Sequence, residues 1–269
     1  MYAVSAKTND VRVFQVPLRP GPAFALDVPG ISRVISNNPS IKLAFFASPG
    51  NPTGSLLSRA DVESILTHPT WNGVVVLDEA YIDFAHEDAS LAGLVADHPN
   101  LVVLQTLSKA FGMAGIRVGA AFAPAPIAAL LNNLKAPWNV PSPSGALAAA
   151  VLSDAGVSAM HRNRVHMKAQ RAHLMRELPE LDGIGMLRGG SDSNFLLVEV
   201  LNARGCPDNA TAKAVYANLA ETKKVIIRYR GAEPVVNMSQ LYATGLLLPI
   251  QDCCCLRRIT AAWQYSLYS

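Results

Sequence analysis

The chain has 269 residues, half of them hydrophobic, and carries a formal net charge of +3 at pH 7. This length allows one large domain or two modest ones with a substantial buried core. No dense Lys/Arg stripe is interleaved with aromatic residues, which argues against a nucleic-acid-binding protein. The longest apolar stretch, about residues 120–131, is interrupted by Pro124 and Pro126, which argues against a membrane span. Because no basic-then-apolar leader opens the sequence, we expect a cytoplasmic protein without membrane or nucleic-acid partners.

Hydrophobic runs predict five strands in the first half of the chain. They lie near residues 11–16, 41–46, 73–77, 101–105 and 118–123. Helical or loop segments separate them, which predicts βαβ units and a mainly parallel sheet. We therefore interpret residues 1–140 as a large α/β domain.

A proline-containing break at residues 137–143 precedes the second half of the chain. The patterns that follow predict helices at residues 144–152, about 157–178 and about 209–221, and strands at residues 195–200 and 225–228. Residues 141–269 are therefore interpreted as a smaller α+β domain with linking helices.

Neither cysteines nor histidines have a spacing that predicts a metal site. Cys206 and the run at residues 253–255 lack paired Cys-x-x-Cys spacing, so we expect reduced thiols. His161, His166 and His173 fall in a predicted helix without the i, i+4 zinc spacing. We expect no metal.

Polar side chains follow three of the predicted strands. Asn51, Asp78 and Lys109 come directly after or at the end of these apolar runs, and Arg117 follows eight residues after the lysine. Ligands of open parallel sheets bind outside the carboxyl ends of the strands. We therefore expect these four residues to converge.

The segment around Lys109 offers amine chemistry and anion binding together. Thr106 and Ser108 supply hydroxyl groups just before the lysine, and Arg117 supplies a guanidinium. This combination predicts a Schiff-base lysine beside a phosphate site. The alternative is an ordinary turn lysine with its ammonium group in water.

Four motifs in this order resemble the class I and II aminotransferases, which are fold-type I pyridoxal-phosphate enzymes. The motifs are Asn51-Pro52-Thr53-Gly54, Asp78-Glu79-Ala80-Tyr81, Thr106-Leu107-Ser108-Lys109 and the later Arg117. More narrowly, residues 78–84 and 105–112 resemble histidinol-phosphate aminotransferases, most closely the fungal ones. The resemblance covers about residues 2–230 and implies a fold-type I PLP-transferase fold.

The resemblance implies pyridoxal 5'-phosphate as cofactor and gives each motif residue a role. Lys109 would form the internal aldimine and then carry the proton from the substrate α-carbon as general base and acid. Asp78 would keep the pyridine nitrogen protonated. Asn51 and Tyr81 would hydrogen-bond the ring 3-hydroxyl, the alternatives being a turn asparagine and a half-buried strand-end tyrosine.

The remaining anion sites follow from the same resemblance. Ser108 and Arg117 would bind the cofactor phosphate, with Thr106 as a weaker candidate. Arg228 would contact the substrate phosphate, or else be a solvated strand-end arginine. Asn194 would contact substrate or cap the strand at residues 195–200. Arg258 would bind the substrate carboxylate, although the adjacent Arg257 leaves that choice open.

The implied reaction is transamination of L-histidinol phosphate with 2-oxoglutarate, giving imidazole-acetol phosphate and glutamate in histidine biosynthesis. The implied assembly is a homodimer. Related alternatives are an aromatic aminotransferase and a threonine-phosphate decarboxylase. A further alternative is a non-catalytic fragment, because the sequence starts after the family's ring-stacking aromatic residue and residues 234–251 intervene before the carboxylate-binding arginine.

Overall fold

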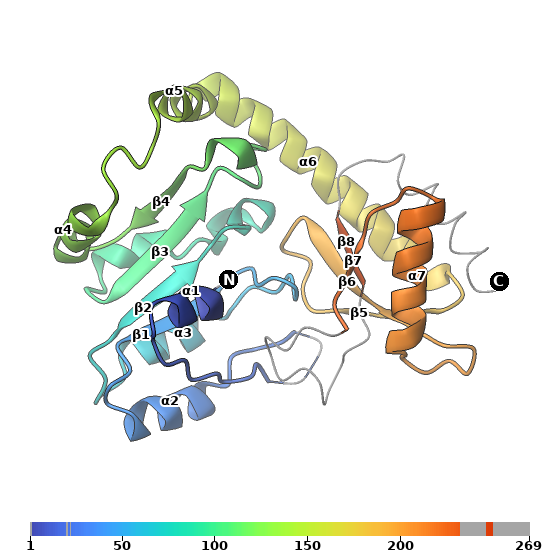
Figure 1. Ribbon diagram of the computed structural model, residues 1–269, viewed down its shortest axis with the longest axis horizontal. Coiled ribbons are helices and arrows are strands. Elements are labelled where there is room, and N and C mark those ends of the chain that lie inside the picture. The colour runs from blue at the N-terminus through green and yellow to red at the C-terminus, as the bar shows by residue number, and fades with distance from the viewer. Residues whose placement is uncertain (1, 20, 22, 232–245, 250–269) are drawn as a thin grey trace. The chain divides into compact units, whose positions relative to one another are not determined.

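The computed structural model describes residues 2–19, 21, 23–231 and 246–249 (Figure 1). The chain divides into two compact units. The first unit consists of Met1–Val16, Ala25–Gly50 and Leu56–Arg164, and the second consists of Pro17–Phe24, Asn51–Ser55 and Val165–Ser269.

The first unit contains a four-stranded sheet in the order β1-β2-β3-β4. Its strands are β1 (Leu43–Ala47), β2 (Val74–Asp78), β3 (Leu101–Thr106) and β4 (Gly119–Phe122). The first three are parallel and β4 is antiparallel to β3, which confirms the predicted mainly parallel sheet. The central strands are apolar throughout their buried part, and Val75, Leu77, Leu101 and Val103 are fully buried.

Helices connect and flank these strands. They are α1 (Tyr2–Thr8), α2 (Val28–Asn37), α3 (Arg59–Leu66), α4 (Ala125–Leu134) and α5 (Ser142–Val151). Short 3-10 helices lie at Ile82–Phe84, Glu87–Ala89, Ala92–Ala96 and Ala114–Ile116.

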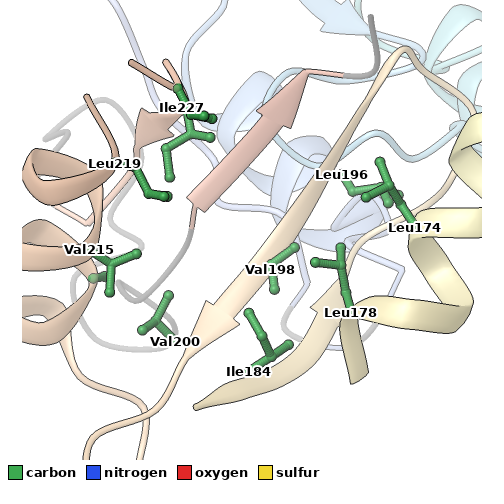
Figure 2. Packing of buried hydrophobic residues seen from close by; sticks show 11 residues of the cluster. Leu174, Leu178, Ile184, Leu196, Val198, Val200, Val215, Leu219 and Ile227 are labelled. Carbon is green, nitrogen blue, oxygen red and sulfur yellow. The ribbon is translucent and has the colours of Figure 1, made fainter. Parts of the chain in front are cut away.

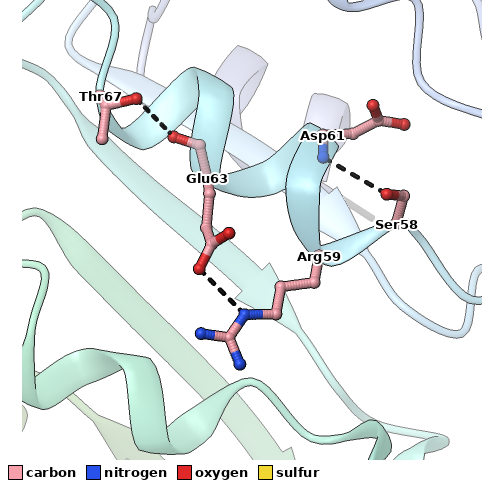
Figure 3. A network of polar contacts seen from close by, with 5 residues as sticks. All are labelled: Ser58, Arg59, Asp61, Glu63 and Thr67. Atoms are coloured by element: carbon pink, nitrogen blue, oxygen red, sulfur yellow. Dashed lines mark hydrogen bonds and ion pairs between the residues drawn. The ribbon is translucent and has the colours of Figure 1, made fainter.

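Helix α3 illustrates why these segments become helical (Figure 3). The Ser58 hydroxyl caps its first turn by accepting from the backbone N–H of Asp61 at 3.4 Å. Arg59 and Glu63 form an i,i+4 ion pair at 2.9 Å on the solvent side. The opposite side buries Val62, Ile65 and Leu66, so packing of this apolar face stabilises the helix.

The strand predicted at residues 11–16 is wrong, because this segment lies outside every strand of the described chain. The segment is rich in apolar residues, but Val11 and Val13 are 55% and 44% exposed. An apolar segment becomes a strand only where a neighbouring strand supplies hydrogen-bond partners, and none of the described strands pairs here. Pro17, which follows, also lacks a backbone N–H.

The second unit contains an antiparallel sheet in the order β5-β6-β8-β7. Its elements are α6 (Asp154–Glu177), of which residues 165–177 belong to this unit, a 3-10 turn (Leu178–Glu180), β5 (Ile184–Arg188), β6 (Phe195–Val200), α7 (Asn209–Thr222), β7 (Arg228–Tyr229) and β8 (Leu246–Pro249). The helices at α5, α6 and α7 and the strand at β6 confirm the predictions for those segments.

The core of the second unit is an apolar cluster between β6, α7 and the end of α6 (Figure 2). All six residues of β6 are buried. Within the cluster, Leu178, Val200 and Leu219 are fully buried. Asp208 begins α7 by accepting from the backbone N–H of Thr211 at 2.6 Å.

One prediction in this unit needs correction, and one strand was missed. The strand predicted at residues 225–228 is shorter and later, because only Arg228–Tyr229 pairs with β8. Val225 and Ile227 are nevertheless buried and Ile226 is exposed, so the alternation reflects packing against the core cluster. Strand β5 was not predicted, since it contains Gly185, which weakens a strand pattern.

Within the described residues, no helix combines the length and apolar character needed to cross a bilayer. The same part of the chain holds no group of three or more His, Cys, Asp or Glu side chains placed to bind a metal ion.

Candidate active site

The carboxylate of Asp78 lies at the carboxyl end of β2 with a donor on each oxygen. Its Oδ1 accepts from the backbone N–H of Ala80 at 3.0 Å, and its Oδ2 accepts from the hydroxyl of Tyr2. The Tyr2 ring stacks on Phe45 of β1, with 4.7 Å between the ring centroids. Burial, together with the hydrogen bond and the charge of Asp78, raises the pKa of the Tyr2 phenol. Tyr2 is therefore a protonated donor at neutral pH.

Lys109 lies in a tight turn after β3. The turn is closed by hydrogen bonds from the backbone N–H of Gly112 to the Lys109 carbonyl at 3.0 Å and from that of Leu107 to the Val118 carbonyl at 3.2 Å. Gly112 has a φ of 68°, a left-handed conformation that suits glycine. The side chain of Lys109 is exposed, and its Nζ lies 5.1 Å from the centroid of the Tyr81 ring. The structure thus brings these two predicted site residues together.

The predicted phosphate-binding residues lie around the same turn. Thr106 donates to the Oγ of Ser108 at 3.0 Å and accepts from the Ser108 backbone N–H at 3.1 Å. Thr106 also pairs with Gly119 across β3 and β4, which places Arg117 just before the paired strand. Arg117 is exposed, has a φ of 57°, and donates to the Ala114 carbonyl at 3.0 Å. Two hydroxyls therefore lie at the end of β3 where the lysine turn begins, and Arg117 follows this turn just before β4.

A buried carboxylate beside Asp78 braces these strand ends. Glu79 is 1% exposed and accepts from the Ser90 hydroxyl at 2.6 Å, the Leu91 backbone N–H at 2.7 Å and the Gln105 amide at 2.9 Å. Because Glu79 lies at the end of β2 and Gln105 lies on β3, this network ties the two strands at the edge that carries the site. Such fully paired polar networks rigidify their surroundings.

The second unit holds the remaining predicted site residues that the structure describes. Asn51 is exposed and its side-chain oxygen accepts from the Nη2 of Arg230 at 3.0 Å. Asn194 is half-buried next to Ser193, whose carbonyl accepts from Arg171 at 2.9 Å. Arg228 is exposed on β7.

Arg258, Arg257 and residues 234–245 and 250–251 lie outside the described residues. The assignment of a carboxylate-binding arginine therefore stays a prediction, as do the roles of the other site residues.

The segment that contains Asn51 is fixed by backbone pairing within the second unit. The backbone N–H of Gly190 donates to the Thr53 carbonyl, and that of Asp192 donates to the Gly54 carbonyl, each at 3.0 Å. A Cβ at Gly189 would lie 1.8 Å from the Thr53 carbonyl oxygen, so only glycine permits this approach.

Three residues that contact or adjoin predicted site residues were missed from the sequence. Tyr2 is separated from Asp78 by 76 positions, and no local pattern relates them. The sequence could have indicated the role of Glu79, because an acidic residue at the end of an apolar strand must be paired if it is buried. Arg230 stands two residues after the predicted Arg228 and is the arginine whose contact with Asn51 the structure gives.

The donor set at the end of β2 and β3 fits pyridoxal phosphate. Lys109 offers a primary amine for an aldehyde, and Asp78 offers a carboxylate for a protonated ring nitrogen. Ser108 and Arg117 offer donors for a phosphate dianion. An ionised carboxylate has about four lone-pair positions, so the two donors already on Asp78 leave room for another.

Comparison with known proteins shows the family of the chain. The sequence pattern of the family "Aminotransferase class I and II" matches residues 1–240. Histidinol-phosphate aminotransferase of Schizosaccharomyces pombe is 47% identical over 237 residues, which are 87% of this chain and 61% of the relative. The Candida maltosa enzyme of the same name is 41% identical, with 87% and 60% covered. The chain thus spans about three fifths of the length of these relatives.

Solved structures show the same fold. Histidinol-phosphate aminotransferase from Sinorhizobium meliloti, in complex with pyridoxal-5'-phosphate, matches with a TM-score of 0.81 at 21% identity, covering 99% of this chain and 67% of that one. The Clostridium acetobutylicum enzyme of the same name also gives 0.81, at 20% identity, covering 98% and 74%. At such identities the likeness establishes the α/β aminotransferase fold of the chain.

Proposed function

Because the chain belongs to the class I and II aminotransferases, we propose that it uses pyridoxal phosphate to transfer the amino group of L-histidinol phosphate to 2-oxoglutarate. The products are imidazole-acetol phosphate and glutamate, and the reaction belongs to histidine biosynthesis. The observation that carries the substrate assignment is the 47% identity to a fungal histidinol-phosphate aminotransferase. The donor set around Lys109 and Asp78 supports the cofactor assignment.

Pyridoxal phosphate supplies an electron-accepting ring that stabilises negative charge at the substrate α-carbon. Lys109 is the amine that would hold the cofactor and, once free, move the proton at that carbon. Its position beside the Tyr81 ring supports this role, because an aromatic face holds an ammonium group without a competing carboxylate. Asp78 would bind the ring nitrogen, with its carboxylate held by the strand end.

The other residues would bind and orient. Ser108 and Arg117, with Thr106, would bind the cofactor phosphate, which their shared position around the lysine turn supports. Tyr81 and Asn51 would hydrogen-bond the ring 3-hydroxyl.

Arg228 would bind the phosphate group of the substrate, and Arg258 would bind the substrate carboxylate. Asn194 would contact a polar group of the substrate. The exposure of Arg228 is consistent with a residue that meets a ligand anion. We also propose a cytoplasmic homodimer, as the family resemblance implies.

Titration of the purified chain with pyridoxal phosphate, followed by a substrate panel, tests this proposal. We expect a visible absorption band that requires Lys109, and turnover of histidinol phosphate with 2-oxoglutarate. The panel includes phenylalanine and threonine phosphate, which represent the aromatic aminotransferase and the threonine-phosphate decarboxylase alternatives. Turnover of only one of those would overturn the substrate assignment, whereas failure to bind pyridoxal phosphate would overturn the cofactor assignment.

A further inference from the structure

The hydroxyl of Tyr2 contacts the carboxylate of Asp78 and has no role in the function proposed above. We propose that Tyr2 is a positioning residue, which orients the Asp78 carboxylate toward the ring nitrogen of the cofactor. This inference rests on the proposed function, because it gives Asp78 the same ligand.

The two oxygens of Asp78 are held from different sides. The backbone N–H of Ala80 donates to Oδ1 at 3.0 Å, and the Tyr2 hydroxyl donates to Oδ2. A carboxylate held on one oxygen only can rotate about its side-chain bond, whereas donors on both oxygens fix its plane. The remaining lone-pair positions can then accept a ring N–H, so Tyr2 and the cofactor can bind the carboxylate together.

Tyr2 is itself placed by its surroundings. Its ring stacks on Phe45 with an interplanar angle of 27°, and Phe45 lies on β1, the strand paired with β2. The register aligns Ala47 with Asp78, so the stacking partner and the carboxylate belong to adjacent strands of one sheet. A phenol is protonated at neutral pH, and the raised pKa of Tyr2 keeps it a donor at higher pH as well.

If Tyr2 had a different role, removal of its hydroxyl would have the opposite effect on cofactor binding. If Tyr2 filled the position that the ring nitrogen needs, removal of its hydroxyl would strengthen cofactor binding. If it positions the carboxylate, removal would weaken binding, and only for a cofactor that has the ring nitrogen.

The test measures dissociation constants of two cofactors for the unchanged chain and for Tyr2→Phe, which keeps the stacked ring. The cofactors are pyridoxal phosphate and its 1-deaza analogue, in which C–H replaces the ring nitrogen. We expect Tyr2→Phe to weaken binding of pyridoxal phosphate about fivefold to tenfold, as for the partial loss of a charge-assisted hydrogen bond. Binding of the 1-deaza analogue should change by less than about twofold, because it makes no such bond.

Two controls separate this effect from general destabilisation. Tyr216→Phe alters a partly exposed tyrosine on α7 and should leave both constants unchanged. In an Asp78→Ala background, Tyr2→Phe should have no further effect on pyridoxal phosphate.

Equal losses for both cofactors, tighter binding by Tyr2→Phe, or an effect that persists without Asp78 would each overturn the inference. Any of these results leaves the proposed function standing if the unchanged chain binds pyridoxal phosphate. If the unchanged chain does not bind it, both fail.

Discussion

The end of β2 and β3 in the first unit and strand β6 in the second bury their residues by different means. At the first, the fully buried Glu79 has three hydrogen-bond donors, and Asp78 precedes it in the chain. At the second, all six residues of β6 are buried. Leu196, Val198 and Val200 belong to the apolar cluster, and Glu199 is ion-paired with Arg188. The hydrogen bonds that Glu79 accepts form a hydrogen-bonded frame at the strand ends that carry the site. The apolar cluster, in contrast, stabilises the fold and carries no predicted site residue. Variants at each region should separate activity from stability.

The largest effect is expected on activity at Lys109. Lys109→Ala should lower the rate of transamination by roughly 10²–10⁴-fold, the usual contribution of a positioned acid–base group. The unfolding midpoint should stay unchanged, because the side chain is exposed. Steady-state rates and thermal unfolding measure the two quantities, with Lys213→Ala on the exposed face of α7 as control. Equal rates in both variants would remove Lys109 from the mechanism.

The largest effect on stability is expected in the apolar cluster. Leu178 is fully buried among the core residues that Figure 2 shows. Leu178→Ala should lower the free energy of unfolding by about 3 kcal/mol, through lost burial and a cavity. Leu130→Ala is the matched control, because Leu130 is 61% exposed and should cost much less. Urea unfolding of both variants decides this, and similar losses would show that the cluster is not the stabilising core.

Glu79 tests whether the hydrogen-bonded frame also stabilises. Glu79→Gln replaces one acceptor oxygen by an NH2 group, which faces the donors that the glutamate oxygen accepted from. We therefore expect a loss of about 2 kcal/mol in the free energy of unfolding. Glu79→Gln combined with Gln105→Glu restores the donor–acceptor pattern and should recover part of that loss. Glu87→Ala is the control, since its ion pair with Arg164 involves a glutamate side chain that is 84% exposed. A loss as small as that of Glu87→Ala would contradict the role of the frame.

The helix cap at Ser58 should have a smaller effect. Ser58→Ala removes the acceptor for the Asp61 N–H and should cost about 1 kcal/mol of stability. Ser58→Asp, which retains an acceptor, should cost less. Chemical denaturation of the two variants measures the difference, and an equal loss in both would show that the capping bond does not stabilise α3.

The smallest effect is a pH dependence at Asp83. Burial raises the pKa of this carboxyl above its usual value, although Arg164 opposes the shift. A raised pKa means that folding favours the protonated form. The stabilisation is therefore complete below the unfolded pKa, about 3.9, and is lost as the pH rises through the folded pKa.

Asp83→Asn removes this dependence. Relative to the unchanged chain, the variant should gain stability as the pH rises above about 4. Melting temperatures of the two chains between acidic and neutral pH give the difference. A difference that stays constant or narrows with rising pH would contradict the assigned burial cost.

The sequence predicted the features that depend on local patterns. Short apolar runs located β1, β2, β3 and β6, because runs of this length bounded by turn residues are typical of strands. The spacing of motifs selected Asp78 and Lys109, and the structure places both at the end of adjacent strands. Residues 11–16 had a strand pattern but lack a described partner strand, and partners are not visible in a single segment.

Long-range contacts could not be predicted for the same reason. The bond between Tyr2 and Asp78 joins segments that only the sheet brings together. The pairing of Gly190 with Thr53 likewise depends on a close backbone approach that no sequence motif predicts. Roles assigned through family resemblance stay predictions where they concern ligands.

The pairing of Asn51–Ser55 with the loop at Gly189 and Gly190 has a consequence for biosynthesis. A ribosome delivers the chain from its N-terminus, so Asn51–Ser55 emerges before β2, β3 and β4 have been made. Its partner loop emerges only after α6 is complete. Asn51–Ser55 therefore cannot form these backbone hydrogen bonds while the sheet of the first unit is being synthesised. The second unit therefore cannot close around it until late in translation, which sets the order in which the nascent chain can fold.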